Sequence, residues 1–190
     1  MLPRIGDIDV MFHFGTDLAI PRGHPPPTQL PAEFHDNVQV HEILDSHCPG
    51  YVYLELRYLL TQCDDDKYNA VEYVRNPCLS NRFYDDISMF GKPHGPAIIP
   101  LGEARLTTDV VYSVRHLVWP PQAAAWPTRH RKRNYGWPDS ATVDRVVSNG
   151  CDVVPMAHRQ CRQHEFISQF QWRLSFSRAE IVLMNSWIPV

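Results

Sequence analysis

The feature that most constrains this chain is the segment 6–12, which reads Gly-Asp-Ile-Asp-Val-Met-Phe. In a strand, successive side chains alternate between two faces, so the apolar residues at positions 8, 10 and 12 share one face and Asp7 and Asp9 share the other. The apolar face suits packing on a core, whereas two carboxylates about 6–7 Å apart on the other face repel each other. The segment therefore predicts a half-buried strand that carries paired acids.

A bound cation would relieve that repulsion. Hard divalent ions such as magnesium take oxygen ligands, and two-metal phosphoryl-transfer sites need carboxylates that reach both ions. The alternative is a solvent-facing acid pair on an edge strand, because the D-x-D spacing is common.

A second candidate strand, residues 107–114, holds one acid, Asp109, among β-branched residues. If the two strands pair, Asp109 supplies the third carboxylate of a metal-binding triad. The alternative is that Asp109 is an ordinary turn or cap residue.

Composition places the chain among globular proteins. Its 190 residues suit one domain or most of a larger one, and they are 44% hydrophobic and 21% charged. A net charge of −3 gives no overall attraction to nucleic acid or to an anionic membrane. The sequence contains no apolar run of about 18 residues, so we expect no membrane span. Five cysteines without a C-x-x-C spacing indicate reduced thiols, so we expect a cytoplasmic protein, with the nucleus as the alternative.

Local patterns predict several further elements. We expect a strand over 51–57 after the Pro49-Gly50 turn, and a solvated acidic loop at 64–66. A short helix is expected over 80–90, followed by a turn at 94–97. A second helix is capped by Asp139-Ser140 and ended by Asn149-Gly150, and a strand follows over 151–156.

In the stretch 170–176, apolar residues at 170, 172, 174 and 176 alternate cleanly with other residues. Its polar face carries Gln171, Arg173 and Ser175, which could bind a phosphate or a base edge or could form an ordinary solvent face. Ser177 and Glu180 have the spacing of a capping box, so we expect a helix to begin at Ser177.

Two further clusters admit more than one interpretation. The basic run Arg129 to Arg133 lies among tryptophans and suits either nucleic-acid binding or a charged helix face. His158, Cys161 and His164 have an H-x2-C-x2-H spacing, which is an incomplete zinc pattern or a polar loop.

Taken together, three stretches resemble the nucleotidyltransferase family of cyclic GMP-AMP synthase and the male-abnormal twenty-one (Mab) domain proteins. They are residues 6–12, residues 108–111 with the following Trp119-Pro120 region, and residues 172–180, of which the last is the most specific. The resemblance implies an α+β nucleotidyltransferase fold, with a mixed twisted β-sheet and packed helices followed by the start of a helical lobe. Residues 1–118 would form the catalytic sheet region, and 119–190 the connection, the returning strands and the first lobe helix.

The resemblance also implies an activity. Asp7, Asp9 and Asp109 match the three family acids, so they would be catalytic and would hold two magnesium ions, with Mn2+ as the alternative. Arg173 and Ser175 match strand residues that contact the nucleotide base. The family joins nucleoside triphosphates such as ATP and GTP by in-line phosphoryl transfer. Double-stranded RNA or DNA would be the activator, and nucleic-acid sensing in innate immunity the role.

The sequence departs from the family at both ends. The family has a Gly-Ser motif upstream of the paired acids, where a helix N-terminus binds phosphate, and helices beyond the last stretch that in cyclic GMP-AMP synthase carry a zinc-binding insert. We therefore expect a fragment that is inactive alone, from a full-length enzyme. The alternatives are a catalytically inactive interaction or nucleotide-binding scaffold and, less favoured, a nucleic-acid-binding protein acting through residues 129–133.

Overall fold

The computed structural model describes residues 8–82, 91–94, 97–100, 108–129, 136–161 and 165–187. The strands are β1 (Ile8–Phe12), β2 (Asp17–Pro21), β3 (Asn37–Asp45), β4 (Tyr51–Asp64), β5 (Lys67–Glu72), β6 (Gly91–His94), β7 (Ala97–Pro100), β8 (Thr108–Tyr112), β9 (Val114–His116), β10 (Cys151–Val154) and β11 (Gln171–Ser175). The helices are η2 (Pro121–Ala123, a 3-10 helix), α1 (Ser140–Ser148), α2 (Glu165–Ser168) and α3 (Ser177–Ser186).

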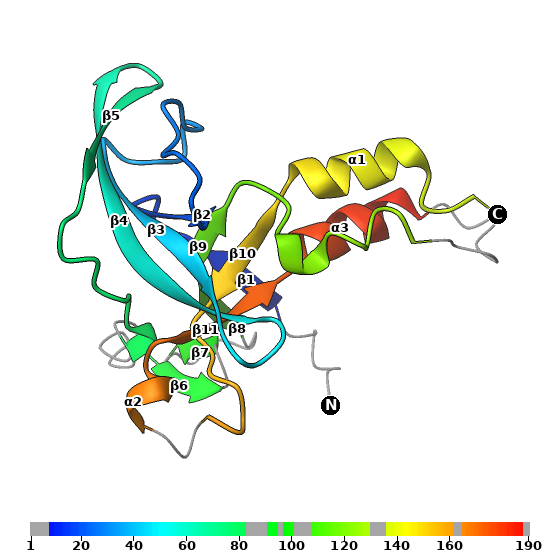
Figure 1. Cartoon of the computed structure of the whole chain (residues 1–190). Helices are drawn as coiled ribbons and strands as arrows, with labels where there is room; N and C mark the ends of the chain where they lie inside the picture. Colours follow the sequence, from blue (N-terminus) through cyan, green and yellow to red (C-terminus); the bar gives the residue numbers. More distant parts are fainter. Residues whose placement is uncertain are drawn as a thin grey trace.

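The strands form two sheets, with the orders β1-β8-β7-β6 and β11-β10-β9-β2-β3-β4-β5 (Figure 1). In the larger sheet β4 also pairs with β11, so six strands close into a ring and β5 extends it as an outer hairpin. Strand β2 runs parallel to β3 and β9, and the other pairs of this sheet are antiparallel. The predicted α+β class with a mixed sheet is therefore present.

Strand β4 is far longer than the expected strand 51–57. It has 14 residues. Its first residues pair with β11, whereas positions 58–64 pair with β5. One strand thus serves both the ring and the outer hairpin.

The ring encloses the main core. Each of its six strands contributes side chains to one buried cluster, whose members are Ala19, Ile43, Val52, Leu54, Val114, Cys151, Val153, Trp172 and Leu174. Trp172 is fully buried, and its indole N–H donates to the Leu79 carbonyl oxygen over 3.0 Å. The alternation predicted for 170–176 is confirmed at Trp172 and Leu174, which point inward.

Helices α1 and α3 lie side by side and α3 contacts β10 (Figure 1). The predicted cap of α1 is confirmed, since the Asp139 carboxylate accepts from the Thr142 N–H over 2.8 Å. Helix α3 begins at Ser177 as predicted, but the capping box is wrong. Its N-cap is Phe176, which makes no side-chain cap bond, and the Ser177 hydroxyl lies 3.1 Å from the Ser175 hydroxyl instead.

The other predicted elements are found where the structure describes them. The expected strand 151–156 is β10, which ends at Val154. His94 at the end of β6 is the register partner of Ala97 at the start of β7, and residues 95 and 96 of the predicted turn lie outside the described residues. The helix expected over 80–90 falls mostly on residues 83–90, outside the described residues. None of the described helices has the length and apolar character needed to cross a membrane.

Candidate functional site

The two strands that carry the predicted acids are neighbours. Strand β1 pairs with β8 in parallel, and the register sets Asp9 opposite Asp109. Adjacent strands lie about 4.8 Å apart, so the backbone positions of these two acids are side by side. The pairing on which the predicted triad depends is present, and it joins segments 100 residues apart. Asp7 lies outside the described residues.

Asp109 lies on the face of β8 that points away from the main core. Tyr112 and Val114 both pack on that core, so the alternation of inward and outward side chains continues through Ser113. The Ser113 N–H donates to the Phe12 carbonyl oxygen over 2.9 Å, so the contact of β1 with this segment extends to Ser113. Counting back from Tyr112 places the half-buried Asp109 on the outward face.

An aromatic cluster fixes β1 against β8. The Phe12 ring meets Tyr112 edge-on at 5.8 Å between centroids, and Phe14 stacks on Tyr112 at 5.1 Å. Such pairs add about 0.5–1.5 kcal/mol beyond the area they bury. These contacts hold the strand register that brings Asp9 and Asp109 together.

A row of polar side chains crosses the outward face of the ring at the same level on three strands. Asp152 on β10 is paired with Arg115 on β9 and with Ser175 on β11. Asp152 is fully buried; one carboxylate oxygen accepts from the Arg178 Nε of α3 over 2.7 Å, and the other has no partner among the described residues. Helix α3 therefore covers this row and neutralises its acid.

Arg115 in the same row is a structural cation. Its guanidinium donates to the carbonyl oxygens of His116 (3.0 Å), Cys151 (2.7 Å) and Asn149. Burial lowers the pKa of Arg115, and Arg178 lowers it further, whereas Asp152 acts in the opposite direction. All these contacts are made within the protein, so Arg115 serves the α1–β10 connection rather than a ligand.

The predicted outward face of β11 is only partly exposed, which corrects the expectation from sequence. Arg173 is half-buried beside Tyr51 and Val154, its register partners. Ser175 is 8% exposed and Gln171 is wholly buried. The physical reason is that α3 and the turns around residues 46–48 and 158–161 lie over this face. Arg173 is thus the more accessible of the two predicted nucleotide-binding residues.

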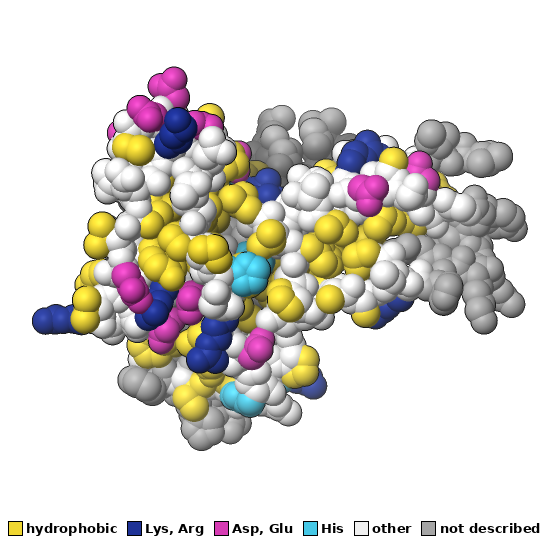
Figure 2. All heavy atoms as spheres, turned by 45° about the horizontal axis from the view of Figure 1, so that its top comes forward, with side chains coloured by type: hydrophobic (Ala, Val, Ile, Leu, Met, Phe, Trp, Pro, Cys, Tyr) yellow, Lys and Arg dark blue, Asp and Glu magenta, His cyan; other side chains and the backbone are white. Residues whose placement is uncertain are grey.

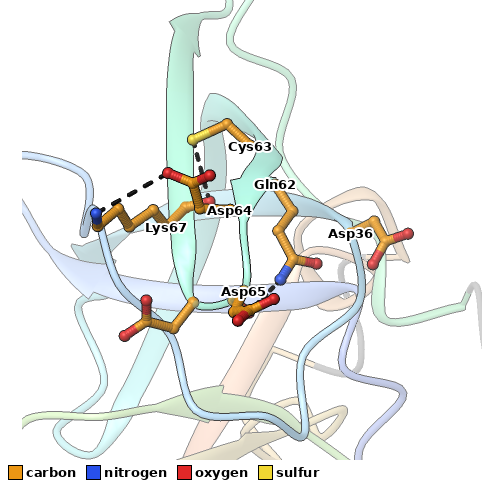
Figure 3. A pocket seen from close by; sticks show the side chains of 7 residues that line it. Asp36, Gln62, Cys63, Asp64, Asp65 and Lys67 are labelled. Carbon is orange, nitrogen blue, oxygen red and sulfur yellow. Dashed lines mark hydrogen bonds and ion pairs between the residues drawn. The ribbon is translucent and has the colours of Figure 1, made fainter.

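A polar hollow lies at the tip of the β4–β5 hairpin (Figure 3). Its lining residues are Asp36, Gln62, Cys63, Asp64, Asp65, Asp66 and Lys67. The Lys67 ammonium is 3.9 Å from the Asp64 carboxylate, and the Cys63 thiol donates to the Lys67 carbonyl oxygen over 3.4 Å. Figure 2 shows acidic side chains gathered at this end of the molecule, exposed to solvent. The predicted solvated loop at 64–66 is confirmed.

The remaining predicted clusters fall differently. Arg129 is exposed, and residues 130–133 of the basic run lie outside the described residues, as does His164 of the zinc-like spacing. Cys161 of that spacing is buried beside His47 and Cys48. Sequence reasoning missed this group, and no local pattern could have found it, because Cys48 and Cys161 are 113 residues apart.

Residues 97–186 match the family model described as the Mab-21 protein nucleotidyltransferase domain. The matched segment contains Asp109, Arg173 and Ser175, together with the stretch 172–180 that carries the most specific part of the resemblance. The resemblance inferred from sequence is thereby confirmed over residues 97–186, which are similar to the Mab-21 protein nucleotidyltransferase domain.

Proposed function

We propose that this chain contributes the acidic centre of a metal-dependent nucleotidyltransferase that joins nucleoside triphosphates. The family match supports a nucleotidyltransferase-like function in general terms. The observation that carries the specific proposal is the in-register pairing of Asp9 with Asp109. In the proposal these two residues and Asp7 hold two magnesium ions, with Mn2+ as the alternative.

The residues present suit a hard divalent cation. Carboxylate oxygens are the ligands that Mg2+ prefers, and Asp109 is half-buried on a face that the main core leaves free. Magnesium bound there would neutralise triphosphate charge and lower the pKa of the attacking hydroxyl. The aspartates would then hold the magnesium ions against the triphosphate of the substrate.

Arg173 is proposed to contact the nucleotide at its base end. Arg173 lies on β11 of the larger sheet, which is linked through β10 to β9, the strand that follows β8 in the chain. Ser175, the other predicted contact, would become accessible to a base only if α3 moved away from it.

The binding experiment compares two acids in one chain. Mg2+-dependent binding of ATP and GTP is measured by calorimetry for the chain, for Asp109→Asn, and for the matched control Asp64→Asn at the exposed hairpin tip. We expect Asp109→Asn to weaken binding at least tenfold and Asp64→Asn to leave it unchanged. Equal affinity of Asp109→Asn and the unsubstituted chain would contradict the proposal.

Turnover is tested with ATP, GTP and Mg2+, with and without double-stranded RNA or DNA, by mass spectrometry of the products. We expect a phosphodiester-linked product that disappears in Asp109→Asn. The burial of Ser175 favours a second candidate, a catalytically inactive scaffold of the same family. That candidate requires Asp109→Asn to leave the cellular function intact, which the enzyme proposal forbids.

A further inference from the structure

Three metal-ligating side chains from two distant turns meet beside the ring. His47 and Cys48 lie in the turn between β3 and β4, and Cys161 lies in the turn after β10. The Cys161 sulfur is 3.8 Å from the Cys48 sulfur and 3.3 Å from His47 Nε2, and all three atoms lie within 4.8 Å of one another. Both cysteines are buried, whereas His47 is exposed.

The separations of the Cys161 sulfur from the Cys48 sulfur and from His47 Nε2 are close to those in a tetrahedral zinc site. With Zn–S about 2.3 Å and Zn–N about 2.05 Å, tetrahedral angles put two sulfurs about 3.8 Å apart and a sulfur and a nitrogen about 3.5 Å apart. A disulfide would need the sulfurs at about 2.05 Å, so the two thiols are not bonded to each other. Thiolate and imidazole are also the ligand types that zinc selects.

One buried side chain holds both turns in place. Gln171 accepts from the His158 N–H over 2.6 Å and donates to the Ser46 hydroxyl over 3.2 Å. Ser46 in turn bonds the backbone of Cys48, and the Cys161 N–H donates to the His158 carbonyl oxygen over 2.8 Å. The two ligand-bearing turns are therefore preorganised by β11, as supporting hydrogen bonds do at metal centres.

We propose that His47 Nε2, Cys48 Sγ and Cys161 Sγ bind one Zn2+, with water as the fourth ligand. Three protein ligands and one open position form a known zinc arrangement. The ion would link the two turns where β4 pairs with β11, next to the strand that carries Arg173. This site shares no residue with the acidic pair on β1 and β8, so it stands or falls independently of the proposed activity.

The zinc content of the purified chain is measured by elemental analysis after reduction and dialysis. We expect one zinc per chain, and less than a tenth of that in the Cys48→Ser/Cys161→Ser double variant. Cys63→Ser is the control, because Cys63 is exposed at the hairpin tip and should leave the zinc content unchanged. Absence of zinc from the unsubstituted chain even after incubation with ZnCl2, or retention by the double variant, would overturn the proposal.

His47→Ala covers the case in which the double variant fails to fold, since an exposed histidine is removed at little cost to the core. Co2+ added to the chain should give tetrahedral d–d bands and a thiolate charge-transfer band, and His47→Ala should change both and weaken binding at least tenfold. Unchanged spectra would overturn the assignment of His47. Alkylation of Cys48 and Cys161 should become possible when a chelator is added. If it becomes possible only when a reductant is added, the two cysteines form a disulfide and the proposed site is overturned.

Discussion

Gly150 joins α1 to β10 at a point where the backbone of another strand comes very close. Its φ is +62°, in the left-handed region. A Cβ built at this position would lie 2.2 Å from the His116 carbonyl oxygen and 2.8 Å from the Leu117 carbonyl carbon. Both are backbone atoms, of the last residue of β9 and of the residue after it, so neither belongs to a flexible side chain that could move aside. We therefore expect Gly150→Ala to lower the free energy of unfolding.

Two effects add to this cost. A non-glycine residue in the left-handed region costs about 1–2 kcal/mol. Forcing a strand to shift around an extra methyl group costs about 1–3 kcal/mol more. The expected loss in free energy of unfolding is the sum, about 2–5 kcal/mol, which is a large fraction of the stability of a typical domain at about 5–15 kcal/mol.

The assay is urea unfolding followed by tryptophan fluorescence. Gly23→Ala and Gly50→Ala are matched controls, because both glycines have positive φ but a Cβ there would meet nothing within 4 Å. The controls should lose only the conformational part, about 1–2 kcal/mol. If Gly150→Ala is no less stable than the controls, the close approach of α1–β10 to β9 is refuted.

Three further predictions concern groups whose ionisation the fold perturbs. Burial lowers the pKa of His116 from its ordinary 6.5, so the buried ring is neutral and the free energy of unfolding falls as the pH falls below that value. Urea unfolding at about pH 7.5 and about pH 5 should show a smaller loss of stability for His116→Gln than for the unsubstituted chain. Hydrogen bonds from Thr142 lower the pKa of Asp139 below 3.8, so its contribution is present above that value and is lost in acid. Asp139→Asn should keep the helix cap without this acid dependence, and Asp139→Ala should lose both, as measured by circular dichroism. Burial raises the pKa of Cys151 to about 12, so iodoacetamide at mildly alkaline pH should label Cys63 and leave Cys151 unmodified in the mass spectrum.

Local features were predictable from sequence because their causes are local. The ends of α1 follow from Asp139 as a capping residue and from Gly150 as a residue that tolerates positive φ. The inward positions of β11 follow from strict alternation around Trp172. The family resemblance was also readable, because the most specific stretch, 172–180, is continuous in sequence.

Features that depend on distant contacts were not predictable. Alternation correctly set Gln171 and Ser175 on the outward face of β11, but it carries no information on what covers that face. The capping box failed because the Ser177 hydroxyl contacts Ser175, a residue of the preceding strand. The length of β4 was underestimated because its residues 58–64 are held in the strand by pairing with β5 rather than by a local pattern.

Each of the two proposed sites combines residues from inside and outside the segment that matches the family model. The match begins at residue 97, yet Asp109 pairs with Asp9, and Cys161 lies beside His47 and Cys48, all from the earlier half. Each site is therefore assembled across the boundary of the matched segment. A relative that retains only the matched segment would keep the acid at 109 and the thiol at 161 without their partners. Metal binding at either site should then follow the presence of residues 8–64, and not the strength of the family match.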